Sequence, residues 1–266
     1  MIIKSIAGHS GCQVLLCEDG DKKFIRKISP SGEYNLRLMG QVEKQGKFKN
    51  EAIRRPVVYC DGFLQGRYYV DMEYIKGISL HSFISLNTIN NVIPVINSLC
   101  TYLGNIKKCD SVLDLTTPIE EKISLLRPPC GDKYSSFLDY CLSYPWNRVL
   151  SSSNHGDLTF ENIIISKGTI YFIDFLDSKI NTKYVDYAKL MLDALIGWSW
   201  RIKDDTPLIK VMRVYNILVE SLGHESLELC KRLLVLNLMR IVPYSNKESM
   251  SFLEPRIRHI GEIYHI

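Results

Sequence analysis

The pattern of apolar residues changes once along the chain, near Gly77, and this change limits the folds that the sequence can adopt. Before it, short runs rich in β-branched and aromatic residues predict strands, with one helical stretch inserted among them. After it, long segments carry apolar residues at helical spacing, interrupted by one predicted β-hairpin. The sequence therefore predicts an α+β chain with a small β-rich lobe at residues 1–75, a larger and mainly helical lobe at residues 76–266, and a hinge near residues 73–77.

The composition is typical of a globular protein. The chain has 266 residues, of which 46% are hydrophobic, and this is enough to bury a substantial core. The formal net charge is only +4, with no block of like charge, which argues against a nucleic-acid partner. Eight cysteines form no C-x-x-C pair, and no run of about 18 apolar residues could span a membrane. We expect a soluble, cytoplasmic protein with reduced thiols and no membrane partner; the sequence indicates no oligomeric state.

One run after the change of pattern, NHGDLTFENIII, combines polar residues that suit phosphoryl transfer. Asp157 is a candidate general base, and Asn162 follows it by five residues. Asp174 comes at the end of the next predicted strand, TIYFID. Asp and Asn oxygens suit the hard Mg²⁺ ion, so the last two are candidate metal ligands. His155 is a further candidate of the catalytic loop, and we expect it to hold the loop by hydrogen bonds rather than to react. Each of these residues also has a purely structural explanation, because Asp and Asn favour turns.

The run HGDLTFENIII…IDFLDS resembles the catalytic loop and metal-binding strand of the aminoglycoside phosphotransferase and choline kinase superfamily. The match is specific over residues 155–177 and looser elsewhere. The resemblance implies a protein-kinase-like fold with two lobes, and ATP and Mg²⁺ as cofactors. It also implies that Asp157 is the catalytic base and that Asn162 and Asp174 bind the metal.

The strand KKFIRKI would supply the phosphate-binding lysine of such a fold. Strand alternation places Ile25 and Lys27 on one face and Arg26 on the other, which favours Lys27. Glu43 follows Lys27 by 16 residues, in the middle of the inserted helix, and is the candidate partner of Lys27. Glu33 is the alternative, but it lies near the helix start, where the helix dipole explains a carboxylate more simply.

The inserted helix itself is predicted from GEYNLRLMGQVEKQGKF. Its apolar residues Leu36, Met39 and Val42 recur at helical spacing, and Gly46 lies near its end.

Two further segments resemble nucleotide-binding parts of the same fold. AGHSGCQV is similar to the hairpin that covers the phosphates, with Gly8, Ser10 and Gly11 at its tip. It lacks the three-glycine pattern of protein kinases. DMEYIKG resembles the hinge, where the backbone of Glu73 and Ile75 would bind adenine. A routine turn and a routine linker are the structural alternatives.

The spacing after Asp174 favours a small acceptor. Only 11 residues separate Asp174 from Asp186, no Gly follows Phe175, and there is no Ala-Pro-Glu. A peptide-binding segment has no room here. The run VDYAKL resembles the family's Asp-x-Ala segment, which implies a structural role for Asp186 at a helix start.

The class of acceptor is less constrained by the sequence. Polycationic aminoglycosides need carboxylates, whereas residues 185–266 carry 11 Lys and Arg against 10 Asp and Glu. Choline-type acceptors need an aromatic cage. Trp198, Trp200, Tyr215 and Tyr244 could supply such a cage, although aromatic residues at helical spacing are more often core. The candidate acceptor-binding residues are Asp177, Arg240, Tyr244 and the pair Trp198 and Trp200.

The sequence thus predicts an ATP- and Mg²⁺-dependent kinase that phosphorylates a hydroxyl of a small molecule, such as a sugar, an amino-alcohol or an aminoglycoside-like compound. A nucleotide-binding pseudokinase is the main alternative, although the three residues that it would lack are all present. An atypical protein kinase is the second alternative.

Overall fold

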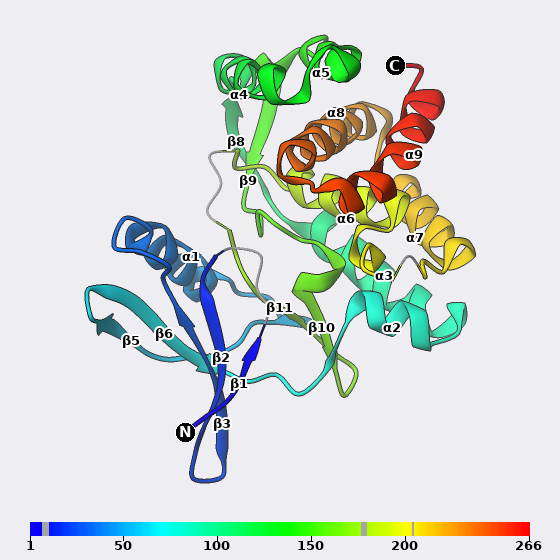
Figure 1. Cartoon of the computed structure of the whole chain (residues 1–266). Helices are drawn as coiled ribbons and strands as arrows, with labels where there is room; N and C mark the ends of the chain where they lie inside the picture. Colours follow the sequence, from blue (N-terminus) through cyan, green and yellow to red (C-terminus); the bar gives the residue numbers. More distant parts are fainter. Residues whose placement is uncertain (7–10, 177–179, 204) are drawn as a thin grey trace. The chain divides into compact units, whose positions relative to one another are not determined.

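The computed structural model of the chain describes residues 1–6, 11–176, 180–203 and 205–266, with the backbone alone at 108–110. The chain divides into two compact units. Unit 1 comprises Met1–Leu80 and Asn162–Asp177, and unit 2 comprises His81–Glu161 and Ser178–Ile266. Both units are shown in Figure 1.

Unit 1 contains a five-stranded antiparallel sheet in the order β1-β2-β3-β6-β5. Its strands are β1 (Ile2–Ile6), β2 (Gln13–Asp19), β3 (Lys22–Ile28), β5 (Val58–Leu64) and β6 (Arg67–Glu73). Helix α1 (Asn35–Lys47) packs on this sheet through Leu38, which is buried with Cys12 and Tyr68. The predicted β-rich segment with one inserted helix is confirmed.

The hairpin that follows loop 155–160 belongs to unit 1 because it joins a second, four-stranded sheet. The order is β4-β11-β10-β7, with β4 (Ile53–Arg54), β7 (Ile78–Ser79), β10 (Ile163–Ser166) and β11 (Thr169–Phe172). The turn of the hairpin is Lys167-Gly168, both at positive φ (48° and 79°), the conformation that a two-residue hairpin turn requires. Gly77 passes so close to β10 that a Cβ there would lie 2.5 Å from the carbonyl oxygen of Ile165.

Unit 2 is mainly helical, as predicted. Its helices are α2 (Leu80–Leu86), α3 (Ile89–Asn105), α4 (Thr116–Cys130), α5 (Ser135–Leu142), α6 (Tyr184–Ile196), α7 (Leu208–Glu220), α8 (His224–Ile241) and α9 (Lys247–Tyr264). Helix α6 is buried along almost its whole length and packs against α7 and α8 (Figure 1). A two-stranded sheet, β8 (Lys108–Leu113) with β9 (Val149–Ser152), completes the unit.

The inward face of α1 differs from the expectation. Leu36 is 80% exposed and Met39 is 38% exposed, whereas Leu38, Gln41 and Gln45 are buried. The two glutamines are buried because their amide groups find hydrogen-bond partners in unit 1, which an apolar pattern cannot indicate. The short β8–β9 pair was also not indicated by the sequence pattern.

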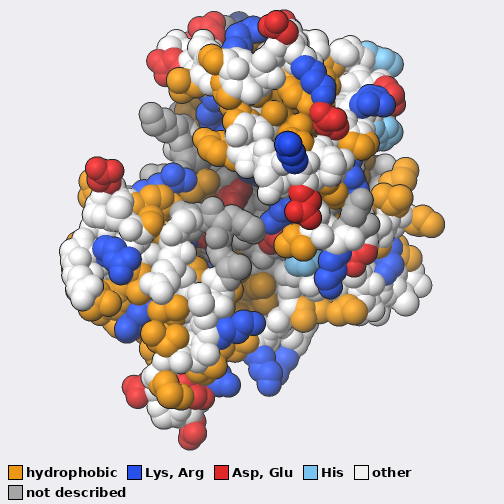
Figure 2. Space-filling model, in the orientation of Figure 1, with side chains coloured by type: hydrophobic (Ala, Val, Ile, Leu, Met, Phe, Trp, Pro, Cys, Tyr) orange, Lys and Arg blue, Asp and Glu red, His pale blue; other side chains and the backbone are white. Residues whose placement is uncertain are grey.

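On the face shown in Figure 2, acidic and basic side chains are interspersed. Among the described residues, no helix combines the length and the hydropathy that a membrane crossing requires. None of the described cysteines forms a disulfide.

Candidate active site

Lys27 of β3 is a buried cation in unit 1. Its ammonium lies 2.5 Å from a carboxylate oxygen of Asp174 and 3.2 Å from the side-chain oxygen of Gln41. The adjacent Arg26 points to the other face of the strand and forms a two-bond pair with Asp71, at 2.7 and 2.6 Å. Lys27 and Arg26 thus point to opposite faces of β3, as strand alternation predicts, and Lys27 is the one that meets Asp174.

The expected pairing of Glu43 with Lys27 is wrong in this structure. Glu43 is exposed and forms an ion pair with Lys47, one turn further along α1, at 2.5 Å. Gln41 occupies the inward position instead, because α1 turns the face that contains Leu38 towards the sheet. The sequence signal that could have found Gln41 is its spacing of three residues from Leu38.

Asn162 and Asp174 lie at the open end of the hairpin. The N–H of Ile173 donates to the carbonyl of Asn162 at 3.0 Å, so the backbones of these two segments are adjacent. Asp174 has a φ of 59°, a left-handed conformation that is uncommon for a residue other than glycine. An amide oxygen and a carboxylate thus come from neighbouring positions of one hairpin.

The segment after Asp174 is held in place by Lys44 of α1 and by Phe48, the residue that follows α1. The ring of Phe175 is buried and lies 5.2 Å from the ring of Phe48. The ammonium of Lys44 donates to the carbonyl of Leu176 at 2.8 Å. These contacts fix the backbone on the C-terminal side of the candidate metal ligand.

In unit 2, the loop that carries Asp157 is held by Asp186, near the start of α6. The Asp186 carboxylate accepts the N–H groups of His155, at 2.6 Å, and Gly156, at 2.9 Å. The N–H of Asp157 points to Nδ1 of His155 at 3.3 Å. Asp186 thus holds the backbone of this loop near the start of α6, and the ring of His155 accepts a hydrogen bond within the loop.

Sequence reasoning missed Lys189. Its ammonium lies 2.9 Å from a carboxylate oxygen of Asp157, and the Lys189 side chain is only 18% exposed. Burial by itself would raise the pKa of Asp157, but the charge and the hydrogen bond of Lys189 outweigh burial, and the charge of Arg240 adds to the effect, so the pKa is lowered. Asp157 is therefore ionised at neutral pH.

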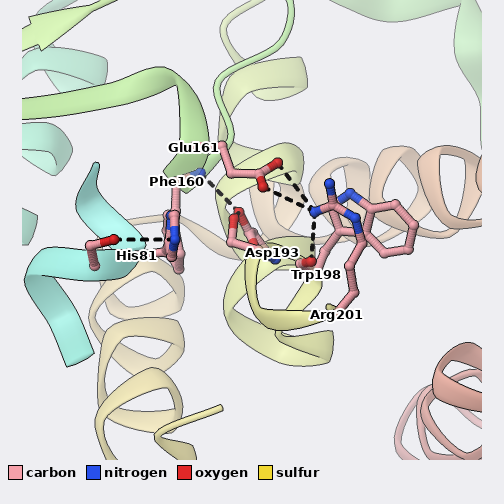
Figure 3. A network of polar contacts seen from close by, with 8 residues as sticks. His81, Phe160, Glu161, Asp193, Trp198 and Arg201 are labelled. Carbon is pink, nitrogen blue, oxygen red and sulfur yellow. Dashed lines mark hydrogen bonds and ion pairs between the residues drawn. The ribbon is translucent and has the colours of Figure 1, made fainter. Parts of the chain in front are cut away.

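Asp193 holds the end of the same loop. Its buried carboxylate accepts the N–H of Phe160 at 2.8 Å, together with the N–H and hydroxyl of Ser199 at 2.8 and 2.6 Å. In Figure 3, Asp193 points to the backbone of Phe160, and the carboxylate of Glu161 points to Arg201. Burial raises the pKa of Asp193 to about 6, and the hydrogen bonds oppose this shift.

The three residues Asp186, Lys189 and Asp193 form a polar stripe on α6. Their spacing of three and then four residues places them on one face of the helix. Each member of the α6 stripe contacts a different part of loop 155–160. A polar stripe in an otherwise apolar helix is the sequence signal that could have predicted these contacts.

The aromatic candidates for an acceptor cage do not come together. The ring of Trp198 is covered by the guanidinium of Arg201, 4.6 Å from its centroid. Trp200 is buried and its indole N–H donates to Ser85. The hydroxyl of Tyr215 lies 3.0 Å from that of Tyr264, and Tyr244 is 90% exposed. Among the described residues, no two of these four candidate rings are in contact.

The candidate nucleotide contacts are only partly described. Gly8 and Ser10 lie outside the described residues, as does the acceptor candidate Asp177. Gly11 has a φ of 75°, which suits a tight turn. The N–H of Glu73 donates to Val57 at 2.8 Å, so only its carbonyl is a candidate for adenine.

Comparison with known proteins shows the fold of the chain. No protein-family model matches the sequence, and no curated protein matches it significantly. A thermostable mutant of the aminoglycoside phosphotransferase APH(4)-Ia has a TM-score of 0.66 and 12% identity, covering 97% of this chain and 92% of that one. The choline kinase LicA from Streptococcus pneumoniae has a TM-score of 0.57 and 17% identity, covering 98% and 95%. A glucosamine kinase has a TM-score of 0.56 and 10% identity, covering 95% and 76%.

These likenesses confirm the predicted α+β, protein-kinase-like fold and place its structural neighbours among the small-molecule kinases.

Proposed function

We propose that the protein is a phosphotransferase that uses ATP and Mg²⁺ to phosphorylate a hydroxyl of a small molecule. The observation that carries this proposal is the contact between Lys27 and Asp174, which are 147 residues apart, beside Asn162. A buried ammonium next to two hard oxygen donors is what a magnesium-bound triphosphate requires. The fold neighbours support the same activity, because one of them is a ternary complex with ADP and hygromycin B.

The metal would be held by the side-chain oxygens of Asn162 and Asp174. The donor set fits, since Mg²⁺ accepts one or two protein oxygens and completes its shell with water and phosphate. Among the described residues no group of three His, Cys, Asp or Glu could hold a metal, so a site built wholly from protein is not expected. Mg²⁺ would neutralise charge on the phosphates. Lys27 would bind a phosphate oxygen once nucleotide draws it from Asp174.

Asp157 would orient the acceptor hydroxyl. The hydroxyl oxygen forms a bond to the γ-phosphorus while the bond from that phosphorus to the ADP oxygen breaks. ADP leaves with the electron pair, and the hydroxyl proton passes to Asp157. A carboxylate with a lowered pKa is a weak base, so Asp157 would accept this proton late and would act mainly by orientation.

Two substitutions test this proposal. Asp157→Ala should reduce phosphate transfer by about 10²- to 10⁴-fold while nucleotide still binds. Asp174→Ala should weaken the binding of Mg-ATP much more than that of metal-free ATP. The control is Asp139→Asn, an exposed acid in α5 that pairs with Arg127. An unchanged rate of phosphate transfer in Asp157→Ala would refute the assignment of Asp157 as the base. Equal losses of affinity for Mg-ATP and for metal-free ATP in Asp174→Ala would refute the assignment of Asp174 as a metal ligand.

A protein substrate is less well supported than a small molecule. The 11 residues between Asp174 and Asp186 are too few for a peptide platform, and Asp186 is already committed to the loop at His155. Turnover of a model peptide without turnover of any small molecule would favour that second function.

A further inference from the structure

The carboxylates around the Asp157 loop already accept hydrogen bonds or form ion pairs with groups of the protein. Asp186 accepts two backbone N–H groups, and Asp193 accepts three donors. Glu161 lies 3.1 Å from Arg201, whose side chain is only 10% exposed. Asp157 itself is paired with Lys189. A cationic acceptor that reached Asp157 would have to displace the partly buried ammonium of Lys189, and separating such an ion pair is costly.

One positive charge near Asp157, that of Arg240, forms no ion pair with a carboxylate of the described residues. Arg240 is exposed in the last turn of α8, and its side chain has one hydrogen bond, to Asn237 at 3.3 Å. Within the described part of the chain, no carboxylate lies within ion-pair distance of this guanidinium. Helix α8, which carries Arg240, packs against α6, which carries Lys189, the partner of Asp157. The charge of Arg240 acts in the same direction as that of Lys189 and helps to lower the pKa of the Asp157 carboxyl group. The charges of both Lys189 and Arg240 therefore act on Asp157.

The rings that could receive a quaternary ammonium are used elsewhere. Arg201 already occupies the face of Trp198, and a second cation would be repelled by that guanidinium. Trp200 packs between Phe160 and His81, with ring centroids 6.0 and 5.8 Å away. The chemistry of this side of the loop is therefore unsuited to choline-like or aminoglycoside-like cations.

We propose that the acceptor is an anion whose carboxylate or phosphate group binds to Arg240, while its hydroxyl is oriented by Asp157. This inference rests on the proposed function and specifies its substrate class. An arginine on the surface of the site binds a carboxylate or phosphate by two parallel hydrogen bonds, which gives both affinity and orientation. Lys189 keeps Asp157 ionised when the negative acceptor approaches.

A transfer assay distinguishes the acceptor classes. The small molecules of the expression host are separated by ion exchange into cationic, neutral and anionic fractions, and each is incubated with the protein, Mg²⁺ and ATP labelled at the γ-phosphate. Labelled product from the anionic fraction is expected. Product from only the cationic or neutral fraction would overturn the anionic acceptor and leave the proposed function standing. Product from no fraction would refute the proposed function itself.

Four defined probes refine the result: glucosamine, glucose, gluconate and glucose 6-phosphate share a carbon skeleton and differ in charge. If turnover is found, the two anionic probes should exceed the other two, and their ratio separates a carboxylate from a phosphate acceptor. Preference for glucosamine would contradict the inference.

A substitution tests the role of Arg240 directly. Arg240→Gln should raise the KM for the anionic acceptor by about 10- to 100-fold, because a charge-assisted contact is lost, with a smaller change in kcat. Arg240→Lys should recover part of the loss. The matched control is Arg213→Gln, an exposed arginine of α7 that pairs with Glu220. An unchanged KM in Arg240→Gln would overturn the assignment.

Discussion

The side-chain oxygen of Gln41 lies 3.2 Å from the ammonium of Lys27, and both side chains are buried. Because Gln41 is uncharged, Asp174 is the one carboxylate within ion-pair distance of Lys27 in the described structure. Lys27 is therefore oriented by a neutral dipole from α1 and by a charge from the candidate metal strand.

Removal of the Gln41 amide should affect both stability and ATP binding. Gln41→Ala leaves a buried ammonium with one hydrogen-bond partner fewer, so the free energy of unfolding should fall by about 1–3 kcal/mol. The KM for ATP should rise because Lys27 loses its orientation. Glu43→Ala, two residues away, is the control and should change neither quantity measurably, since Glu43 is exposed. Denaturant unfolding and initial-rate kinetics measure both effects; a larger effect from Glu43→Ala would contradict the assignment.

Lys189 should set the acid limb of the pH–rate profile. The ammonium lowers the pKa of Asp157, so Lys189→Met should raise that pKa, and activity should be lost at a higher pH as the solution is acidified. Lys189→Arg retains the charge and should restore the limb at least in part.

The control for this experiment is Lys231→Met. Lys231 forms a comparable half-buried pair with Glu228 on α8, at 2.7 Å. A general loss of stability would appear in both variants, whereas a moved acid limb should appear only in Lys189→Met. An acid limb that stays in place would mean that Lys189 does not act on Asp157.

Asp193 should make part of the stability depend on pH. Burial raises its pKa in the folded chain to about 6, from the ordinary value of 3.8 for an aspartate side chain. Between these two pH values the folded state holds a proton that the unfolded state has released. The contribution of Asp193 to the free energy of unfolding therefore falls by about 3 kcal/mol as the pH rises from about 4 to 6. Above about pH 6 this contribution is constant. Asp193→Asn removes the titration, so the stability difference between wild type and variant should shrink over this range.

Urea unfolding at several pH values measures the effect. Ser199→Ala removes a donor to the Asp193 carboxylate, which should raise the pKa of Asp193 further. The fall in stability should then extend to higher pH. A stability difference between wild type and Asp193→Asn that does not vary with pH would contradict the raised pKa.

Gly77 should tolerate no side chain. A Cβ at Gly77 would lie 2.5 Å from the carbonyl oxygen of Ile165 and 2.7 Å from Cγ2 of Ile164, so β10 would have to move. Gly77→Ala should therefore lower the free energy of unfolding by about 1–3 kcal/mol. Gly46→Ala in α1 meets no atom within 4 Å and should stabilise the chain by about 0.5–1 kcal/mol. Equal midpoints for the two variants in urea would contradict the close approach.

Short-range patterns predicted much of the fold and part of the candidate site. Alternation along β3 identified Lys27 rather than Arg26, because neighbouring side chains in a strand must point to opposite faces. The sequence also marked the hairpin with its Lys167-Gly168 turn, and Asp157, Asn162 and Asp174 as a set suited to phosphate and metal chemistry.

Tertiary structure determined which face of each helix is buried and which distant residues that face contacts. Glu43 was favoured by its spacing from Lys27, but packing of Leu38 on the sheet placed Gln41 inward. Lys189 belongs to a helix that begins well after the loop in sequence, and only the packing of α6 brings its ammonium to Asp157. Local sequence determines the period with which side chains alternate along a helix or strand. Long-range packing determines the partner of each buried polar group, because such a group needs a hydrogen-bond partner and that partner can come from a distant part of the chain.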